Sequence, residues 1–166
     1  MSARRGFTLI ETLVVVLIMA TLSALAIGMM RPGQEERLQG AARLFARDVE
    51  WARSATLTNP DDPVALRLAS DGSGWLVSRN STPDTPLVAS DGSSMRRTFG
   101  QGSFEAAAGV RLISSSASQR TIEFEPFGGV RQSPASVSFA LSDLKTQCRI
   151  TFESGSGNIQ TTWTNP

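Results

Sequence analysis

The stretch RRGFTLIETLVVVLIMATLSALAIGMM, residues 4–30, decides the architecture of this chain. From Phe7 to Met30 the only ionisable side chain is the carboxylate of Glu11. As a helix this segment would be roughly 36 Å long at about 1.5 Å per residue. That length exceeds the hydrocarbon thickness of a bilayer, about 30 Å. The sequence therefore predicts a membrane-spanning helix over residues 7–30.

Two other interpretations of this apolar run fit less well. A secretory signal peptide has an apolar region of about 7 to 15 residues that ends at a small-residue cleavage site. The run here is longer, and the residues MMRPGQ at its end form no such site. A helix buried in a protein core is the remaining alternative, although so long an uninterrupted run is more typical of a membrane span.

The basic residues around the run leave its orientation open. Two arginines precede it and four follow it, namely Arg4 and Arg5, then Arg31, Arg37, Arg43 and Arg47. The enrichment of cytoplasmic loops in Lys and Arg therefore favours neither orientation. Long domains are translocated largely regardless of their charge. We expect a cytoplasmic N-terminus and a C-terminal domain outside the cytoplasm, chiefly because of the N-terminal motif at residues 4–18.

The residues RRGFTLIETLVVVLI, 4–18, resemble the leader and helix start of the type IV pilin superfamily. The shared features are a short basic stretch, a glycine, an aromatic residue and a glutamate inside an apolar helix. The resemblance implies that a membrane-embedded prepilin peptidase cuts after Gly6 and methylates the new amino group of Phe7. Residues 1–6 would then be a leader peptide, and the mature chain would begin within the membrane.

The carboxylate of Glu11 needs a physical reason, because a charge at the bilayer centre costs about 2.5 to 3.5 kcal/mol. Glu11 is nearer the cytoplasmic edge, which lowers this cost, and cleavage would create a partner in the amine of Phe7. Four residues correspond to about 6 Å of helical rise, which is too far for a good ion pair within one chain. The resemblance assigns Glu11 to assembly, where it meets the amine of a neighbouring subunit. The alternative is a side chain that reaches the headgroups and has no function.

Residues 31–58 predict an amphipathic helix that continues the span. Its apolar side chains recur with the 3.6-residue helical period, so one face is expected to pack on a domain. That face comprises Leu38, Ala41, Ala42, Phe45, Val49, Ala52 and Thr56, and Arg43, Arg47 and Glu50 lie opposite. Pro32 and Gly33 predict a kink or short break, and Pro60 marks the end.

Leu44 and Trp51 do not fit this division of the helix into two faces. They are seven residues apart and project together from a flank, outside the main apolar stripe. Either the buried face is wide enough to include them, or they contact a neighbouring subunit, since Trp is enriched at interface hot spots.

From Val64 onward apolar and polar residues alternate with period two. VALRLAS at residues 64–70 and WLVSRN at residues 75–80 are joined by an Asp-Gly turn and predict a hairpin. Further strands are expected at GVRLISSS, RTIEFEPF, SVSFALS, CRITFES and NIQTTWT. Residues 79–109 predict a long surface loop that carries a short strand. The fold class is α+β, with a long N-terminal helix packed on an antiparallel β-sheet domain of residues 59–166.

The sequence contains no catalytic constellation. Histidine is absent, so Ser-His-Asp and Cys-His arrangements and His metal ligands are excluded. We expect neither an enzyme nor a cofactor. Glu123 and Glu125 alternate with Ile122 and Phe124, which predicts a solvated strand face rather than an acid/base pair. Cys148 is the one cysteine and is expected to be a small buried hydrophobe.

The segment ASDGS occurs twice, at residues 69–73 and 89–93. Aspartates in Gly-rich loops can bind calcium, but the alternating acidic ligands of a calcium loop are missing. Asp-Gly turns explain both copies, and we expect no metal site.

The charge distribution gives no footprint for nucleic acid. Of the 16 basic and 15 acidic residues, Arg4, Arg5 and Glu11 precede residue 31, which leaves 14 of each, interleaved. The doublet Arg96–Arg97 lies in an expected loop. The minor pilins that bind DNA carry a Gly-Arg-x-Arg stretch near the C-terminus, whereas no arginine follows Arg149 here. We expect at most weak, non-specific binding of DNA.

Two C-terminal segments, residues 122–141 and 148–163, narrow the family. IEFEPFGGVRQSPASVSFAL and CRITFESGSGNIQTTW resemble the H-type minor pseudopilins of type II secretion and their pilus relatives. The resemblance implies a structural subunit of a periplasmic filament that exports folded proteins across the outer membrane, anchored in the bacterial inner membrane. Its partners would be the prepilin peptidase and other minor and major pseudopilins. The alternative is a minor pilin of a type IV pilus, involved in pilus assembly or DNA uptake.

Overall fold

The structure is a computed structural model that describes residues 9–29, 33–116, 118–141, 147–153 and 158–164. It divides into two compact units, Met1–Gly33 and Gln34–Pro166, each of which is described by itself. The described elements are those of an α+β chain, with two α-helices and two antiparallel sheets.

The first unit contains helix α1, Leu9–Met29. Its described hydroxyl groups donate to carbonyl oxygens about one turn earlier at 2.7–2.8 Å, so they are satisfied within the helix. Among the residues that the structure describes, no helix combines the length and the apolar character that crossing a bilayer requires. The helix predicted over residues 7–30 extends beyond the described residues at both ends.

The second unit begins with helix α2, Gln34–Thr58. Glu35 and Glu36 lie in its first turn, where carboxylates stabilise the positive end of the helix dipole. All seven residues of the predicted apolar stripe are buried, whereas Arg43, Arg47 and Glu50 are exposed, so the predicted division of the faces is confirmed. Gly33 lies outside both helices. The expected kink at Pro32 falls outside the described residues.

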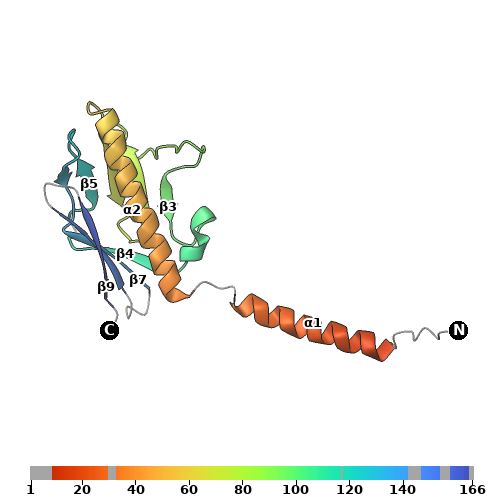
Figure 1. Cartoon of the computed structure of the whole chain (residues 1–166). Helices are drawn as coiled ribbons and strands as arrows, with labels where there is room; N and C mark the ends of the chain where they lie inside the picture. The colour runs from red at the N-terminus through yellow and green to blue at the C-terminus, as the bar shows by residue number, and fades with distance from the viewer. Residues whose placement is uncertain (1–8, 30–32, 117, 142–146, 154–157, 165–166) are drawn as a thin grey trace. The chain divides into compact units, whose positions relative to one another are not determined.

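Nine described strands form the two sheets, and every pairing between them is antiparallel. Sheet 1 has the spatial order β3 (Arg96–Thr98), β2 (Gly74–Arg79), β1 (Val64–Leu68), β5 (Thr121–Phe124) and β6 (Val130–Gln132). Sheet 2 has the order β4 (Val110–Ser114), β7 (Ser136–Leu141), β8 (Gln147–Phe152) and β9 (Ile159–Thr164). Helix α2 contacts strands of both sheets, and Figure 1 shows it lying across them.

The side chain of Phe45 on α2 lies at the centre of the core that these layers share. Its ring is 5.2 Å from that of Trp75 on β2 and 5.3 Å from that of Phe139 on β7, both in edge-to-face geometry. Such aromatic pairs contribute about 0.5–1.5 kcal/mol beyond their area burial. One helix side chain therefore joins sheet 1 to sheet 2.

The predicted hairpin of β1 and β2 is confirmed, with Leu68 opposite Trp75. The expectation of a surface loop at residues 79–109 is only partly correct. The segment carries the short strand β3 and the 3-10 helix η1 (Gly102–Ala107), but it also buries Met95 and Phe104 in the core. The strand β6 was not predicted, because its three residues carry little alternating pattern.

Both ASDGS segments form the expected Asp-Gly turns. The glycines of the two turns, Gly72 and Gly92, have φ of 73° and 80°, a region that favours glycine. In each turn the aspartate accepts a 2.9 Å bond from a serine N–H, Asp71 from Ser73 and Asp91 from Ser93. The serine hydrogen bonds lower the pKa of both carboxyl groups. Their contribution to stability is present above the ordinary Asp pKa and is lost as the pH falls through the lowered value.

Gly74 marks the closest approach of two backbones in sheet 1. A Cβ at this position would lie 1.8 Å from the carbonyl oxygen of Arg97. We expect Gly74→Ala to destabilise the fold by about 3 kcal/mol, because β3 would have to move away. Gly40 of α2 has no atom within 4 Å of such a Cβ, so Gly40→Ala is expected to stabilise by about 0.5–1 kcal/mol. Urea unfolding of both variants checks this, and equal effects would contradict the packing argument.

Candidate functional site

The predicted assembly residue Glu11 lies in the first turn of α1 and is exposed in the single chain. The side chains that surround it along the helix are apolar and also exposed, including Ile10 at 70% and Leu13 at 60%. A carboxylate on such a surface is costly in an apolar medium unless a charged partner reaches it. The two processing residues, Gly6 and Phe7, lie outside the described residues.

The structure separates Leu44 from Trp51 by their degree of burial. Leu44 is half-buried and packs against the core, as the wide-face interpretation expects. Trp51 is 38% exposed and lines a surface pocket of about 330 Å³ together with Ala55 of α2 and Arg79 of β2. Of the two, Trp51 is the side chain that remains accessible for contact with another molecule.

A buried ion pair lies beneath this flank, and sequence reasoning missed it. Asp48 of α2 is 1% exposed, and its Oδ2 accepts a bond of 2.9 Å from Trp75 Nε1 and one of 3.1 Å from Arg97 Nε. Arg97 is itself only 8% exposed. The expectation that the Arg96–Arg97 doublet lies in a loop is therefore wrong, since both residues belong to β3 and Arg97 points into the core. The one signal in the sequence was the position of Asp48. It lies four residues before Ala52, and residues four apart share a face of a helix, so an acid here is expected near the buried face.

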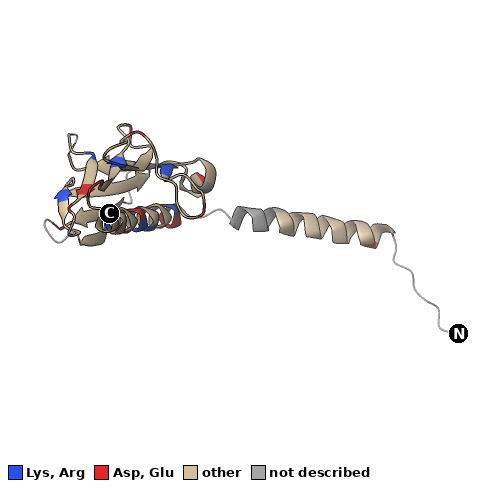
Figure 2. Ribbon diagram, turned by 90° about the horizontal axis from the view of Figure 1, so that it is seen from above, with Lys and Arg blue, Asp and Glu red and all other residues tan. Residues whose placement is uncertain are grey.

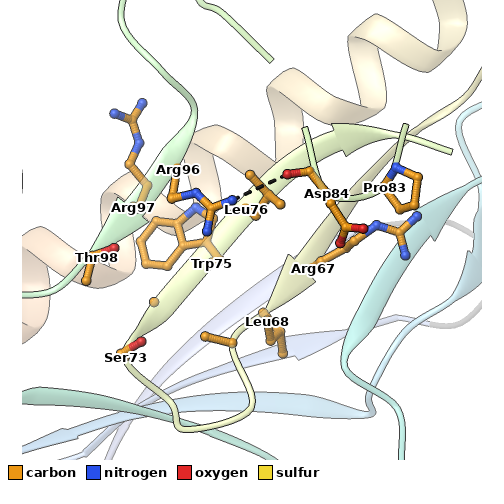
Figure 3. A pocket seen from close by; sticks show the side chains of 12 residues that line it. Arg67, Leu68, Ser73, Trp75, Leu76, Pro83, Asp84, Arg96, Arg97 and Thr98 are labelled. Atoms are coloured by element: carbon orange, nitrogen blue, oxygen red, sulfur yellow. Dashed lines mark hydrogen bonds between the residues drawn. The ribbon is translucent and has the colours of Figure 1, made fainter. Parts of the chain in front are cut away.

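A pocket of about 220 Å³ opens beside β3 on sheet 1. Arg67 and Arg96 line it, and Asp84 contributes from the preceding loop (Figure 3). Arg67 donates to Ser78 Oγ and Asn80 Oδ1, and Arg96 donates at 3.4 Å to the backbone oxygen of Asp84. The guanidinium groups thus tie strand and loop together.

The two carboxylates that the sequence pattern singled out lie in β5 and directly after it. Ile122 and Phe124 of β5 are buried, while Glu123 is half-buried and Glu125 lies exposed beyond the strand end. In the part of the chain that the structure describes, no group of three or more His, Cys, Asp or Glu side chains is placed to hold a metal ion.

Cys148 is fully buried on β8, as its position between polar residues predicted. Burial raises the pKa of its thiol to about 11. We expect no reaction of native protein with a thiol reagent such as Ellman's reagent at pH 8, because the thiolate is scarce and inaccessible. One equivalent should react in guanidinium chloride. Rapid labelling of the native protein would contradict the assigned burial.

Basic and acidic residues are mixed on the second unit, as they are along the sequence. Figure 2 shows basic and acidic positions alternating along α2 and scattered over the strands. Arg97, one half of the basic doublet, is neutralised by Asp48. Over the residues that the structure describes, the charges therefore form little of the continuous positive field that binding to a phosphate backbone requires.

Comparison with known proteins gives one match. Residues 1–27 match the family model of the prokaryotic N-terminal methylation motif. No curated protein and no solved structure matches the chain. The motif implies anchoring in a membrane and assembly into a filament, and it is consistent with processing by a prepilin peptidase and association with other pilins. The chain carries the N-terminal methylation motif of prokaryotic type IV pilin-like proteins, which indicates a pilin-type structural subunit rather than an enzyme.

Proposed function

We propose that the protein is a minor pseudopilin, a structural subunit of the type II secretion filament that helps to export folded proteins across the outer membrane. The observation that carries the proposal is the methylation motif at residues 1–27, followed by an amphipathic helix that packs on a β-rich domain. The motif supplies processing and membrane anchoring, and the domain supplies the surface that meets other subunits.

The C-terminal half carries the segments that resemble H-type minor pseudopilins and their pilus relatives. Strand β5 ends at Phe124, and the next residues form a tight turn in which Gly128 N–H donates to Glu125 O at 2.8 Å. Strand β6 follows, and β8 and β9 close the domain as a hairpin. The segments that carry the resemblance to H-type minor pseudopilins, residues 122–141 and 148–163, contain these strands and β7.

In this proposal the chain crosses the inner membrane once, with residues 7–30 as the span and the second unit in the periplasm. Glu11 receives the methylated amine of a neighbouring subunit. Trp51, with its exposed ring at the edge of a pocket, contributes to a contact with the next subunit.

Deletion of the gene in its native host tests the proposed function. We expect folded exoproteins to accumulate in the periplasm, and a plasmid copy of the wild-type gene to restore their secretion. Surface pili and twitching motility should be unaffected. Normal secretion combined with loss of pili or of DNA uptake would instead assign the chain to a type IV pilus.

A further inference from the structure

Sheet 2 ends in an edge strand that lacks the usual protection. Strand β9 pairs with β8 over six consecutive residues, Ile159 to Thr164, without a bulge. Its sequence, IQTTWT, contains no charge, proline or glycine. In the described part of the chain no strand pairs with its outer edge, and residues 160–163 are exposed.

The other edge strands are protected in the ways that natural sheets use. Strands β3 and β6 have three residues each and carry exposed arginines, Arg96 and Arg131. The remaining edge strand is β4. Its outer edge is partly covered, since Leu112 N–H donates to the backbone oxygen of Gly72, outside sheet 2, at 3.0 Å. A long, uncharged edge without such protection is a template for pairing with another strand.

The side chains of β9 give its two faces different characters. Thr161 and Trp163 face α2, where they line a groove of about 270 Å³ with Ala42 and Ala46. Ile159 packs partly on the core, and Trp163 is 43% exposed. The apolar face of sheet 2 therefore continues to the open edge, where an added strand would extend it.

We propose that the β9 edge pairs antiparallel with β9 of a second copy of this chain, about a two-fold axis through Thr161. In this register Trp163 lies opposite the second copy's Ile159, an aromatic and β-branched pair of the kind that stabilises sheets. Gln160 lies opposite the second copy's Thr162, so two polar uncharged side chains meet. Every side chain that meets across the axis is thus compatible, and no like charges are brought together.

A two-fold pairing also closes the assembly, because it uses the open β9 edge of each copy and leaves none of the described β9 edges free. Six residues of strand make a small interface, so the dimer is expected to be weak and dependent on concentration. The inference does not rest on the proposed secretion function, since it derives from the edge strand alone.

Disulfide crosslinking of the full chain in its native membrane tests the pairing. Opposed residues in antiparallel strands have Cβ atoms about 4.5–5.5 Å apart, close to the range of a disulfide. Thr161→Cys should therefore give a covalent dimer on mild oxidation. Ser70→Cys, at an exposed turn of sheet 1, is the matched control, and Cys148 is too buried to compete. Equal yields from the two variants would overturn the proposal.

A charge exchange in the Thr161→Cys background tests the register. Gln160→Lys with Thr162→Lys places lysines opposite each other in both pairs and should lower the dimer yield about tenfold. Gln160→Lys with Thr162→Glu creates opposite charges across the same pairs and should restore it. Unchanged thermal melting shows that both variants remain folded. Failure of the second variant to restore the dimer, or a ladder of larger species in place of it, would overturn the two-fold pairing.

Discussion

Glu11→Ala is expected to give a chain that is processed and resident in the membrane but no longer joins the filament. The substitution removes an insertion cost of up to about 3 kcal/mol, so membrane entry should be at least as efficient as for wild type. Gly6 and Phe7 are unchanged, so cleavage should largely persist. In the proposed assembly, the variant would lack the carboxylate that receives a neighbour's Phe7 amine, and an apolar medium would offer no water to replace it.

Co-purification or crosslinking with the other pilin-like subunits measures this loss of assembly. Glu11→Asp keeps the charge on a shorter side chain and should retain part of the assembly, whereas Glu11→Gln keeps the size without the charge and should behave like Glu11→Ala. Normal assembly and secretion by Glu11→Ala would show that this carboxylate has another role.

Asp48→Ala should destabilise the second unit by about 3–5 kcal/mol, the cost of breaking a buried ion pair from one side. The variant leaves the guanidinium of Arg97 buried without its counter-charge and removes the acceptor of Trp75 Nε1. A typical domain has a free energy of unfolding of only about 5–15 kcal/mol. A loss of this size would therefore remove a large part of the stability of the second unit. Urea unfolding of the full chain in detergent, followed by tryptophan fluorescence, measures the change.

Two further variants distinguish the effect of leaving a charge buried without its partner from the effect of removing any side chain from α2. Glu50→Ala removes an exposed acid two residues away on the same helix and should change stability by less than about 0.5 kcal/mol. Arg97→Leu combined with Asp48→Ala removes both charges, and it should recover part of the loss. A double variant as unstable as the sum of the single ones would contradict the ion-pair explanation.

The helices and hairpins of this chain could be predicted because their patterns depend only on residues close together in the sequence. In α2 the spacing of Leu38, Phe45 and Val49 reports burial directly, because residues at the helical period share a face. The alternation of β1 and the Asp-Gly turn after it likewise define a hairpin from neighbouring residues alone. Glu11 was singled out in the same way, as a lone charge in an apolar run, and its role in assembly stays a prediction.

The remaining features depend on contacts between distant segments. Asp48 and Arg97 are 49 residues apart, and no local pattern pairs them. The doublet Arg96–Arg97 resembled a loop because two adjacent charges are unusual in a strand. The structure instead places one arginine on each side of β3, one in solvent and one in the core. The open edge of β9 also depends on the order of strands in sheet 2, which the sequence does not reveal.

The mass of the N-terminal peptide of the chain purified from native membranes shows whether the protein is processed as a pilin-type subunit. We expect a chain that begins at Phe7, lacks residues 1–6 and carries one methyl group on its amino nitrogen. A strain without prepilin peptidase should yield the uncleaved, unmethylated chain. An N-terminus that still includes residues 1–6 in a strain with active peptidase would contradict the assignment of this protein as a pilin-type subunit.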